Sequence, residues 1–582
     1  MAAPTIPARL LEQATTRPSA PAYHVRGTNG WEPTSWSGYA ANVRRVAAAL
    51  LASGGEDGQV VCILGNNRPE WVEMDLGAMC INMIPAGIYQ TCSPEEVAYI
   101  INHSEAPIVL VENEAQWAKV NEVRAELPNL KRIVTMRGTS VDDADTLTWD
   151  DFLALGDGTE TADIDARVKG LNPSDAATFI YTSGTTGPPK AVMLSHDNLA
   201  WTADTAVGIV DQTHLDTSLS YLPLSHIAEQ MFTLHAPITS GASVYFAQGI
   251  EQMPDNLKEV QPTVFFGVPR VWEKFHAGIS AKLKLATGVK LRLVNFARRV
   301  GTEVNSLRNQ GKPIGAALSF KYKLANKLIF SKLKPAIGMG NARICVSGAA
   351  PIAPDVLEFM ASLDVTILEV YGQSEGSGPT TFNIPGSTQF GTVGVRLKGV
   401  DVKIADDGEI LLKGRNVFLG YSKDAEATDA ALDKDGWLYS GDLGAFDDNG
   451  FLTITGRKKD IIITAGGKNI APKNIEAALM EHEAISQAVV IGDRRKFLSA
   501  LVAINPERAA EANGDLSSFN DSIQSHIDAI NARFARVEHV RKFTILPREL
   551  DQENAELTPT MKIKRRIVND NWTDAIDAMY AD

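Results

Sequence analysis

The sequence predicts a soluble α/β protein with more than one domain, and three observations lead to this fold class. The chain has 582 residues, more than one hydrophobic core usually serves. With 44% hydrophobic and 22% charged residues, its composition is typical of folded globular proteins. Short apolar runs alternate with amphipathic segments, as strands and helices do around a largely parallel sheet.

The predicted strands are short apolar runs between helical segments. Amphipathic segments such as 42–54 and 353–363 are predicted helices. The strands are predicted at 60–65, 107–112, 132–136, 243–247, 263–267, 343–348 and 365–372.

The pattern changes from about Val400. DG and NG dipeptides separate short strands within 400–414 and 437–456, which predicts hairpins. A second, smaller α+β domain is predicted to begin near residue 460.

Charge and cysteine content exclude several classes of protein. A net charge of -14 argues against general nucleic-acid binding. The four cysteines, Cys62, Cys80, Cys92 and Cys345, lack zinc-ligand or CxxC spacing, so we expect reduced, buried thiols in a cytosolic protein. No apolar run approaches the ~18 residues of a membrane span, and the start does not resemble a secretory signal. We therefore expect a cytoplasmic protein whose membrane contact, if any, is peripheral.

One segment, 282–334, is strongly basic. It contains thirteen Lys/Arg residues and one acid, Glu303, a local charge of +12 that leaves about -26 on the rest of the chain. Apolar residues interleave with the cations, as in helices with a basic face. Two interpretations remain open: a solvated helical insertion, or a surface that meets anionic lipid headgroups or a polyphosphate ligand.

The stretch "IYTSGTTGPPKAVMLSH" (180–196) predicts a phosphate-binding loop. Glycines let backbone N–H groups approach phosphate oxygens, hydroxyls donate further hydrogen bonds, and lysine adds a positive charge. It does not match a nucleotide-hydrolase P-loop, because Ala191 stands at the metal-binding Ser/Thr position and a strand-like run follows Pro188 and Pro189. It is predicted to be a hairpin-like flap; a plain turn is the alternative. The contributing residues are Thr182, Ser183, Gly184, Thr185, Thr186, Gly187 and Lys190.

Four further segments, which follow the flap along the chain, contain polar residues that could bind a nucleotide. In "YGQSE" (371–375), Glu375 could hold Mg²⁺ on a triphosphate and Ser374 could bond a phosphate oxygen, although a surface carboxylate is the simpler interpretation. The segments 439–444, 456–469 and 557–566 are unremarkable alone: Asp442 could be a turn aspartate, and the last basic run a solvated face.

Together, these ordered motifs resemble the adenylate-forming (acyl-CoA synthetase, AMP-binding) superfamily over nearly the whole chain. The segments "YLPLSHIAEQ" (221–230), "QPTVFFGVPRVWEK" (261–274) and "LTPTMKIKRR" (557–566) resemble its long-chain fatty acyl-CoA synthetase branch, including bubblegum-type members. The basic segment falls where that branch has a helical stretch.

The resemblance implies a domain organisation. A large N-terminal domain, 1–458, would combine stacked α/β subdomains with a β-barrel-like part. A small, mobile α+β domain, 459–582, would close over it, with Lys459 at the hinge.

The resemblance also implies a two-step reaction with ATP, Mg²⁺ and CoA. A carboxylate attacks the α-phosphorus of ATP, and the CoA thiol then displaces AMP. Thr182–Lys190 would grip the β- and γ-phosphates, Ser374 would touch the α-phosphate, and Glu375 would hold Mg²⁺. The adenine pocket would comprise Gly348, Ala349, Ala350, Tyr371 and Gly372, and the ribose would bind Asp442 with help from Arg457.

The resemblance assigns the catalytic role to Lys562, which would bridge the carboxylate and the α-phosphate. Gly466 and Gly467 would line the pantetheine channel after the small domain rotates. His226 would lie near the acyl site, with a structural histidine as the alternative.

Three residues depart from the common pattern: Ala191 and Met561 where glycine is usual, and Ser374 where threonine is commoner. None removes a required functional group. The leading hypothesis is a long-chain fatty acid–CoA ligase without an obligate protein partner. A fatty acyl-AMP ligase or an aryl-CoA ligase keeps the first step, and a non-catalytic nucleotide-binding membrane scaffold is the alternative from another class.

Overall fold

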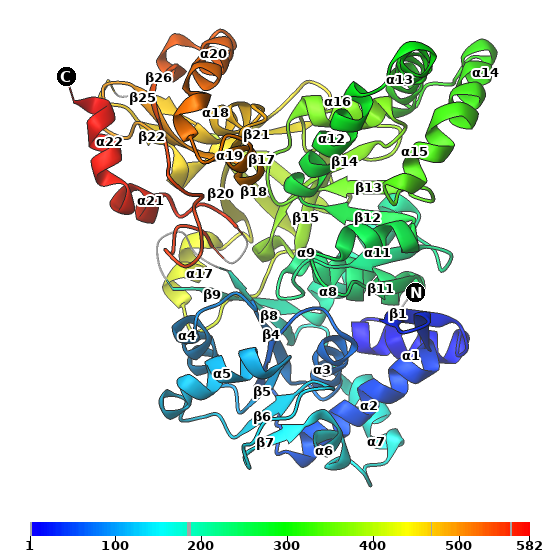
Figure 1. The fold of residues 1–582 in the computed structure, drawn as a ribbon. Helices are drawn as coiled ribbons and strands as arrows, with labels where there is room; N and C mark the ends of the chain where they lie inside the picture. Colours follow the sequence, from blue (N-terminus) through cyan, green and yellow to red (C-terminus); the bar gives the residue numbers. More distant parts are fainter. Residues whose placement is uncertain (1–2, 183–187, 467, 559–560, 582) are drawn as a thin grey trace.

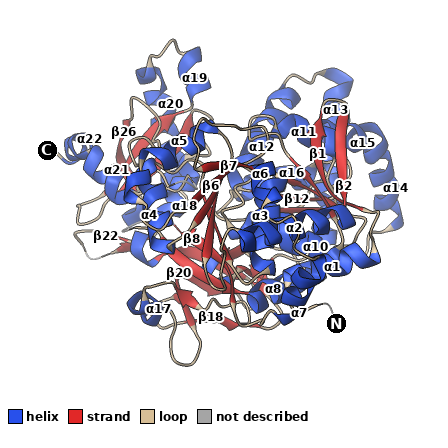
Figure 2. Cartoon of the chain, turned by 90° about the horizontal axis from the view of Figure 1, so that it is seen from below, coloured by secondary structure: helices blue, strands red, loops and turns tan. Residues whose placement is uncertain are grey.

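The computed structural model describes residues 3–182, 188–466, 468–558 and 561–581. Figure 1 shows the N-terminal sheet at the bottom, a second sheet system at the right, and the C-terminal part at the upper left. Figure 2 shows strands in the interior with helices around them. This arrangement confirms the predicted α/β fold class.

The first sheet has eight strands in the order β19-β9-β8-β4-β3-β5-β6-β7. The run from β8 to β7 is parallel, while β9 and β19 add antiparallel edges. Every residue of β3 is buried: Val61 and Ile63 pack in one core, Cys62 and Leu64 in another on the opposite face. Such continuously apolar strands are typical of parallel sheets covered on both sides. The strands are β3 (Val60–Leu64), β4 (Ile84–Ile88), β5 (Ile108–Val111), β6 (Arg132–Thr135), β7 (Thr146–Thr148), β8 (Ala176–Thr182), β9 (Lys190–Ser195) and β19 (Gly420–Tyr421).

Helices of the first 210 residues pack on these two faces. The predicted helix at 42–54 begins earlier, at Trp36, because the Ser35 side chain caps it by accepting a hydrogen bond from the Gly38 N–H. The helices are α1 (Ile6–Thr16), α2 (Trp36–Ala52), α3 (Pro69–Cys80), α4 (Pro94–Ser104), α5 (Glu114–Glu122), α6 (Trp149–Ala154), α7 (Thr161–Gly170) and α8 (His196–Val210).

The second sheet system has two sections, ordered β10-β11-β1-β2 and β12-β13-β14-β15-β16. The Thr263 N–H donates to the Thr217 carbonyl at 3.1 Å, so the sections adjoin through β10 and β12. The strands are β1 (Pro21–Gly27), β2 (Gly30–Ser35), β10 (Thr217–Ser220), β11 (Ser243–Phe246), β12 (Val264–Gly267), β13 (Ile344–Ser347), β14 (Ile367–Gln373), β15 (Gly378–Phe382) and β16 (Val395–Arg396). Its helices are α9 (Ile227–Gln230), α10 (Ala236–Ser240), α11 (Met253–Val260), α12 (Pro269–Lys284), α13 (Gly288–Asn309), α14 (Ala316–Ala325), α15 (Ser331–Ala336) and α16 (Pro354–Ser362).

The predicted hairpins form a four-stranded antiparallel sheet, β17-β18-β20-β21. Gly408 and Gly450 at its turns have φ of +86° and +82°, values that favour glycine. The elements are β17 (Val400–Ile404), β18 (Glu409–Gly414), α17 (Ala425–Ala431), β20 (Leu438–Phe446) and β21 (Leu452–Arg457).

The C-terminal part is α+β and has its own hydrophobic core, as predicted. Its main sheet pairs β24 antiparallel and β26 parallel to the central β25. The domain boundary at 458/459 remains a prediction. The strands are β22 (Ile462–Ile463), β23 (Asn469–Ile470), β24 (Ile485–Ile491), β25 (Leu498–Ile504) and β26 (Val540–Ile545), and the helices are α18 (Pro472–Leu479), α19 (Pro506–Glu511), α20 (Asn520–Asn531), α21 (Arg565–Asn571) and α22 (Thr573–Tyr580).

Most sequence-based expectations about the elements are confirmed. All seven predicted strands are present, each within two residues of its expected bounds. The four cysteines are unpaired and buried, and burial raises the pKa of the Cys62 thiol to about 12. Within the described ranges, we find no helix both long and apolar enough to cross a membrane.

Candidate active site

One large cavity gathers the predicted site residues. Its volume is about 1290 Å³, and residues from the second sheet system, the antiparallel sheet and the C-terminal part line it. Gly466 is described but lies exposed, outside the cavity lining. Ser183, Gly184, Thr185, Thr186, Gly187 and Gly467 lie outside the described residues. The predicted residues in the lining are Thr182, Lys190, His226, Gly348, Ala349, Ala350, Tyr371, Gly372, Ser374, Glu375, Asp442, Arg457, Lys459 and Lys562.

The stretch predicted to bind phosphate joins two antiparallel strands, as expected. Thr182 ends β8, Lys190 begins β9, and the two are paired across the ladder. The Thr182 hydroxyl donates to the Lys190 carbonyl at 3.4 Å. A strand follows Lys190, whereas a P-loop lysine begins a helix.

A tyrosine that sequence reasoning missed connects Lys190 with Glu375. The Tyr421 hydroxyl donates to Glu375 Oε1 at 2.8 Å, and the Lys190 ammonium lies 4.9 Å from the centre of the Tyr421 ring. Lys190 Nζ also lies 3.4 Å from Asp424 Oδ2. Tyr421 reaches this place because β19 pairs with β9, opposite Val192, and no local sequence signal indicates that pairing.

Asp442 lies opposite Arg457 in the pairing of β20 with β21, with Asp442 Oδ1 3.8 Å from Arg457 Nε. The Tyr371 hydroxyl donates to the other carboxylate oxygen at 3.0 Å. Burial, and then the Asp442 charge, raise the pKa of the Tyr371 phenol well above its ordinary value. The phenol therefore stays neutral and holds the carboxylate in one orientation.

Small residues are required where the chain leaves β13 and β14. A Cβ on Gly348 would lie 2.7 Å from Val370 Cγ1, and one on Gly372 would lie 1.7 Å from the Gly378 carbonyl oxygen. Between them in sequence, Ala349 has φ of +72°. These positions form a wall of backbone and small side chains, which suits close approach of a flat ring.

Lys562 enters the cavity from the C-terminal part. Its backbone N–H donates to Thr558 Oγ1 at 3.0 Å, and its carbonyl accepts from the Thr558 N–H at 2.8 Å. Lys562 lines the cavity and is exposed to solvent along part of its side chain, while neighbouring protein groups partly desolvate the ammonium.

The charges around Lys562 favour an anionic ligand. Loss of hydration, and then the cations Arg457 and Lys473, lower the pKa of its ammonium, while Asp442 and Glu375 oppose them only in part. Among the described residues, no carboxylate lies within ion-pair distance of the ammonium. An anion with several negative oxygens would supply the missing countercharge.

His226 both lines the cavity and caps α9. Its Nδ1 accepts a hydrogen bond from the Ala228 N–H at 3.1 Å. Burial, and then the Lys562 charge, lower the pKa of His226 to about 4. At neutral pH the ring is uncharged and carries its proton on Nε2, so it can donate one hydrogen bond. Both interpretations of this histidine stay open.

Lys459 lies in the turn between β21 and β22, at the start of the C-terminal part. Its neighbour Lys458 is tied to the antiparallel sheet, with Nζ 2.6 Å from Asp407 Oδ2 and 2.9 Å from Glu409 Oε2. The hinge role of Lys459 remains a prediction.

Another part of the cavity wall is apolar. It comprises side chains from the end of α8, from the segment that includes α9 and α10, and from β12 and β13. Within the described residues, no three His, Cys, Asp or Glu side chains come together as a metal cluster. The apolar members are Ala206, Ile209, Val210, Ile227, Met231, Phe232, Ala236, Val264, Phe266, Ile344 and Val346.

Comparison with known proteins identifies a family. The model of the AMP-binding enzyme family matches residues 10–422, and the model of the AMP-binding enzyme C-terminal domain matches residues 459–582. The chain is 38% identical to long-chain-fatty-acid–CoA ligase ACSBG2 of Xenopus laevis, over 95% of this chain and 80% of that protein. It is 36% identical to long-chain-fatty-acid–CoA ligase FadD15 of Mycobacterium tuberculosis, over 94% and 92%. The crystal structure of the anthranilate CoA ligase AuaEII with anthranoyl-AMP has the same fold, with a TM-score of 0.74, 20% identity and 98% coverage of each chain.

Gly372→Ala tests the close approach of β14 and β15. The added Cβ would press on the Gly378 carbonyl, so we expect a loss of about 1–3 kcal/mol in stability and a lower thermal-melting midpoint. Gly208→Ala is the control: it lies in α8, where a Cβ would meet nothing within 4 Å, and alanine favours helix by up to ~1 kcal/mol. Equal melting of Gly372→Ala and the wild type would contradict the close approach.

Proposed function

Because the chain belongs to the AMP-binding enzyme family, we propose that it is a long-chain fatty acid–CoA ligase. It activates a long-chain fatty acid with ATP to an acyl-adenylate and transfers the acyl group to CoA, releasing AMP and pyrophosphate. Relatives named as long-chain fatty acid–CoA ligases, 34–38% identical over most of the chain, support this. The main structural support is the cavity, which combines an apolar wall, two hydrogen-bonded acids and a lysine that makes no ion pair with the described residues.

The first step joins two anions. A carboxylate oxygen forms a bond to the α-phosphorus, and the bond from that phosphorus to the bridging oxygen of pyrophosphate breaks. Negative charge accumulates between the reacting groups, and the Lys562 ammonium stabilises it there. Because the ammonium is already partly desolvated and has no ion-pair partner in the described part of the chain, its attraction for a developing anion is strong.

The second step transfers the acyl group. The CoA sulfur attacks the acyl carbonyl carbon, the bond from that carbon to the AMP oxygen breaks, and AMP leaves with the electron pair. AMP is a better leaving group than the oxide ion that would have to leave a free carboxylate. We propose that the C-terminal part rotates about Lys459 between the steps, which would bring Gly466 and Gly467 towards the pantetheine.

We propose the remaining roles from the cavity geometry and the family pattern. Thr182–Lys190 binds the β- and γ-phosphates, and Gly348, Ala349, Ala350, Tyr371 and Gly372 enclose the adenine. Ser374 contacts the α-phosphate, Asp442 and Arg457 bind the ribose, and His226 lies at the acyl group. Glu375 would hold Mg²⁺, which would neutralise phosphate charge when bound; one carboxylate fits, because Mg²⁺ in such sites takes its other ligands from phosphates and water.

The acceptor of the acyl group and the carboxylic acid that is activated distinguish this proposal from its alternatives. A fatty acyl-AMP ligase would release pyrophosphate with palmitate without consuming free CoA thiol, and an aryl-CoA ligase would prefer aromatic acids. A non-catalytic scaffold would bind nucleotide without releasing pyrophosphate. Acid-dependent pyrophosphate release measured beside CoA-thiol loss separates all four, and we expect both with palmitate.

Lys562→Ala should separate the half-reactions. We expect adenylation, measured as palmitate-dependent pyrophosphate release, to fall by about 10²–10³-fold, because a positioned charge is lost from the transition state. Thioester formation from supplied palmitoyl-AMP should persist. Arg566→Ala removes an exposed cation of the same segment and is the control. Equal loss of both half-reactions in Lys562→Ala would contradict its assigned step.

Lys459→Pro should give the opposite pattern. Proline restricts the backbone at the turn, so we expect pyrophosphate release with little acyl-CoA, and accumulation of palmitoyl-AMP detectable by mass spectrometry. Lys459→Ala, which keeps backbone freedom, should retain both steps. If Lys459→Pro damages the two half-reactions equally, the hinge role is wrong.

We further propose a cytoplasmic location, which the unpaired buried cysteines support, and peripheral contact with anionic membranes through the basic segment. This segment comprises the end of α12, then α13, α14 and α15. On α14, Phe320 and Leu324 are 72% and 41% exposed, one helical turn apart, with Lys321, Lys323 and Lys327 exposed around them. An exposed apolar face flanked by cations suits a lipid surface better than a polyphosphate.

The opposite face of α14 packs on α13. Leu318 and Ala325 are buried there against Val300 and Val304, and the two helices lie side by side at the upper right of Figure 1. Leu285 and Val289, near the start of α13, are 81% and 71% exposed. The segment therefore offers apolar side chains to solvent in a region with a local charge of +12.

Flotation with phosphatidylserine-containing vesicles tests the membrane proposal. We expect binding that weakens with added salt, because screening reduces the lysine contribution. The double variant Phe320→Ser/Leu324→Ser should lower the partition at least about tenfold, while Ile250→Ser/Val537→Ser, at exposed apolar sites elsewhere, should not. No binding, or binding that the Phe320 and Leu324 changes leave intact, would refute it.

A further inference from the structure

The apolar wall of the cavity runs along two adjacent parallel strands. Phe266 and Val346 line it near the carboxyl ends of β12 and β13, and Val264 and Ile344 line it at their first residues. The small residues of the proposed adenine pocket, Gly348–Ala350, follow β13 at its carboxyl end. The apolar part therefore extends away from the adenylate site for at least the length of these strands, on the order of 10 Å.

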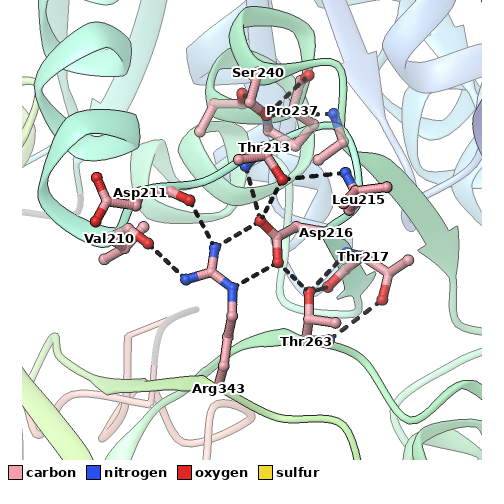
Figure 3. Close-up of polar contacts among 12 residues, drawn as sticks. Val210, Asp211, Thr213, Leu215, Asp216, Thr217, Pro237, Ser240, Thr263 and Arg343 are labelled. Carbon is pink, nitrogen blue, oxygen red and sulfur yellow. Dashed lines mark hydrogen bonds and ion pairs between the residues drawn. The ribbon is translucent and has the colours of Figure 1, made fainter.

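A polar clamp, formed by Arg343 and Asp216, adjoins the cavity-lining residues Val210, Val264 and Ile344. Figure 3 shows the Arg343 guanidinium between the end of α8 and Asp216. It donates to the Val210 carbonyl at 2.6 Å and the Asp211 carbonyl at 3.1 Å. It also donates to both carboxylate oxygens of Asp216, from Nε at 2.7 Å and from Nη2 at 2.6 Å.

Asp216 in turn connects to the neighbouring strand. Its Oδ1 accepts from the Thr263 hydroxyl at 2.7 Å, and its Oδ2 accepts from the Thr213 N–H at 2.8 Å. Asp216 is 4% exposed. Burial alone would raise the pKa of this carboxyl, but the hydrogen bonds from Arg343, Thr213 and Thr263 outweigh burial and hold the pKa below its ordinary value. The clamp is therefore an ionised pair at neutral pH.

Each arm of the clamp adjoins a residue that lines the cavity. Arg343 precedes Ile344, Thr263 precedes Val264, and the carbonyl bound at the end of α8 belongs to Val210 itself. The clamp thus fixes the end of α8 relative to the starts of two strands. The Arg343 side chain is 38% exposed, so the clamp lies near the protein surface.

We propose that the Arg343–Asp216 clamp sets the far wall of the acyl site and thereby the longest fatty acid that fits. Arg343 and Asp216 are positioning residues, since they hold Val210, Val264 and Ile344 in place without contacting the reacting atoms. The proposal rests on the proposed function, because it assigns the apolar wall to the acyl chain. A chain that outgrows the wall must displace the end of α8 against its two hydrogen bonds from Arg343. Four further hydrogen bonds, from Arg343 to Asp216 and to Asp216 from Thr213 and Thr263, hold that guanidinium in place.

The experiment measures acyl-CoA formation with saturated fatty acids of 12 to 24 carbons. Arg343→Gln removes the ion pair and loosens the wall, so kcat/KM for the longest acids should rise relative to palmitate, by about fourfold for each methylene that gains burial. Arg343→Lys keeps the charge beside Asp216 but cannot reach the same acceptors together, and should shift the profile less. If Arg343→Gln fails to fold, Arg343→Lys is the variant that tests the clamp.

Arg308→Gln is the matched control. Arg308 is 43% exposed and pairs at 2.9 Å with Asp364, whose side chain is 5% exposed, the same exposure as that of Asp216. It does not line the cavity. The control should lose comparable thermal stability while its chain-length profile stays that of the wild type. Val210→Phe narrows the far end directly and should shift the profile towards shorter acids.

The outcomes distinguish the clamp from the proposed function. If Arg343→Gln keeps the wild-type profile while Val210→Phe shortens it, the acyl chain lies where we place it and the clamp role is wrong. If Arg343→Gln and Arg308→Gln change the profile alike, the effect is general destabilisation and the clamp role is wrong. If the wild type activates no fatty acid of any length, the proposed function fails and the clamp role fails with it.

Discussion

One electrostatic constraint organises the site: Lys562 lines the cavity, and no carboxylate of the described residues lies within ion-pair distance of its ammonium. Partial desolvation, and then neighbouring cations, disfavour the charged form of Lys562, and the nearby acids Asp442 and Glu375 accept hydrogen bonds from Tyr371 and Tyr421. A site of this kind is completed by an anionic ligand, and a triphosphate beside a carboxylate has the required charge. The excess positive charge around Lys562 then serves both binding and catalysis, because the negative charge that accumulates in the transition state meets an ammonium already in position.

The polar part and the apolar part of the cavity lie at opposite ends of the same strands. Backbone and small residues after β13 and β14 form the polar end, where Gly348 and Gly372 allow close approach. Apolar side chains along β12, β13 and α8 form the other end, which the ion pair of Arg343 and Asp216 ties together. A long apolar chain with a reactive head group matches that polarity, and the strand length separates the two ends by a fixed distance.

Local patterns predicted the elements and most of the candidate site, and long-range pairing explains what they missed. Proline, glycine and the strand-like run after Lys190 were enough to predict a hairpin flap, and Asn449–Gly450 predicted a turn. Tyr421 could not be found in this way, because it meets Glu375 only through the pairing of β19 with β9. Arg343 and Asp216 are 127 residues apart, and their meeting depends on which strands become neighbours. A sequence motif was enough to identify Lys562 as the catalytic candidate. The cations that lower the pKa of its ammonium, Arg457 and Lys473, come from other elements.

The pKa of the Lys562 amine, with and without ATP, tests this account most directly. It can be measured from the pH dependence of chemical labelling of that residue, followed by peptide mass spectrometry. We predict a pKa below the ordinary lysine value of about 10.4 in the free protein, and a rise when Mg²⁺ and ATP are added, because the triphosphate supplies the missing negative charge. An ordinary pKa that ATP leaves unchanged would contradict the central claim that this cavity holds an uncompensated cation for an anionic substrate.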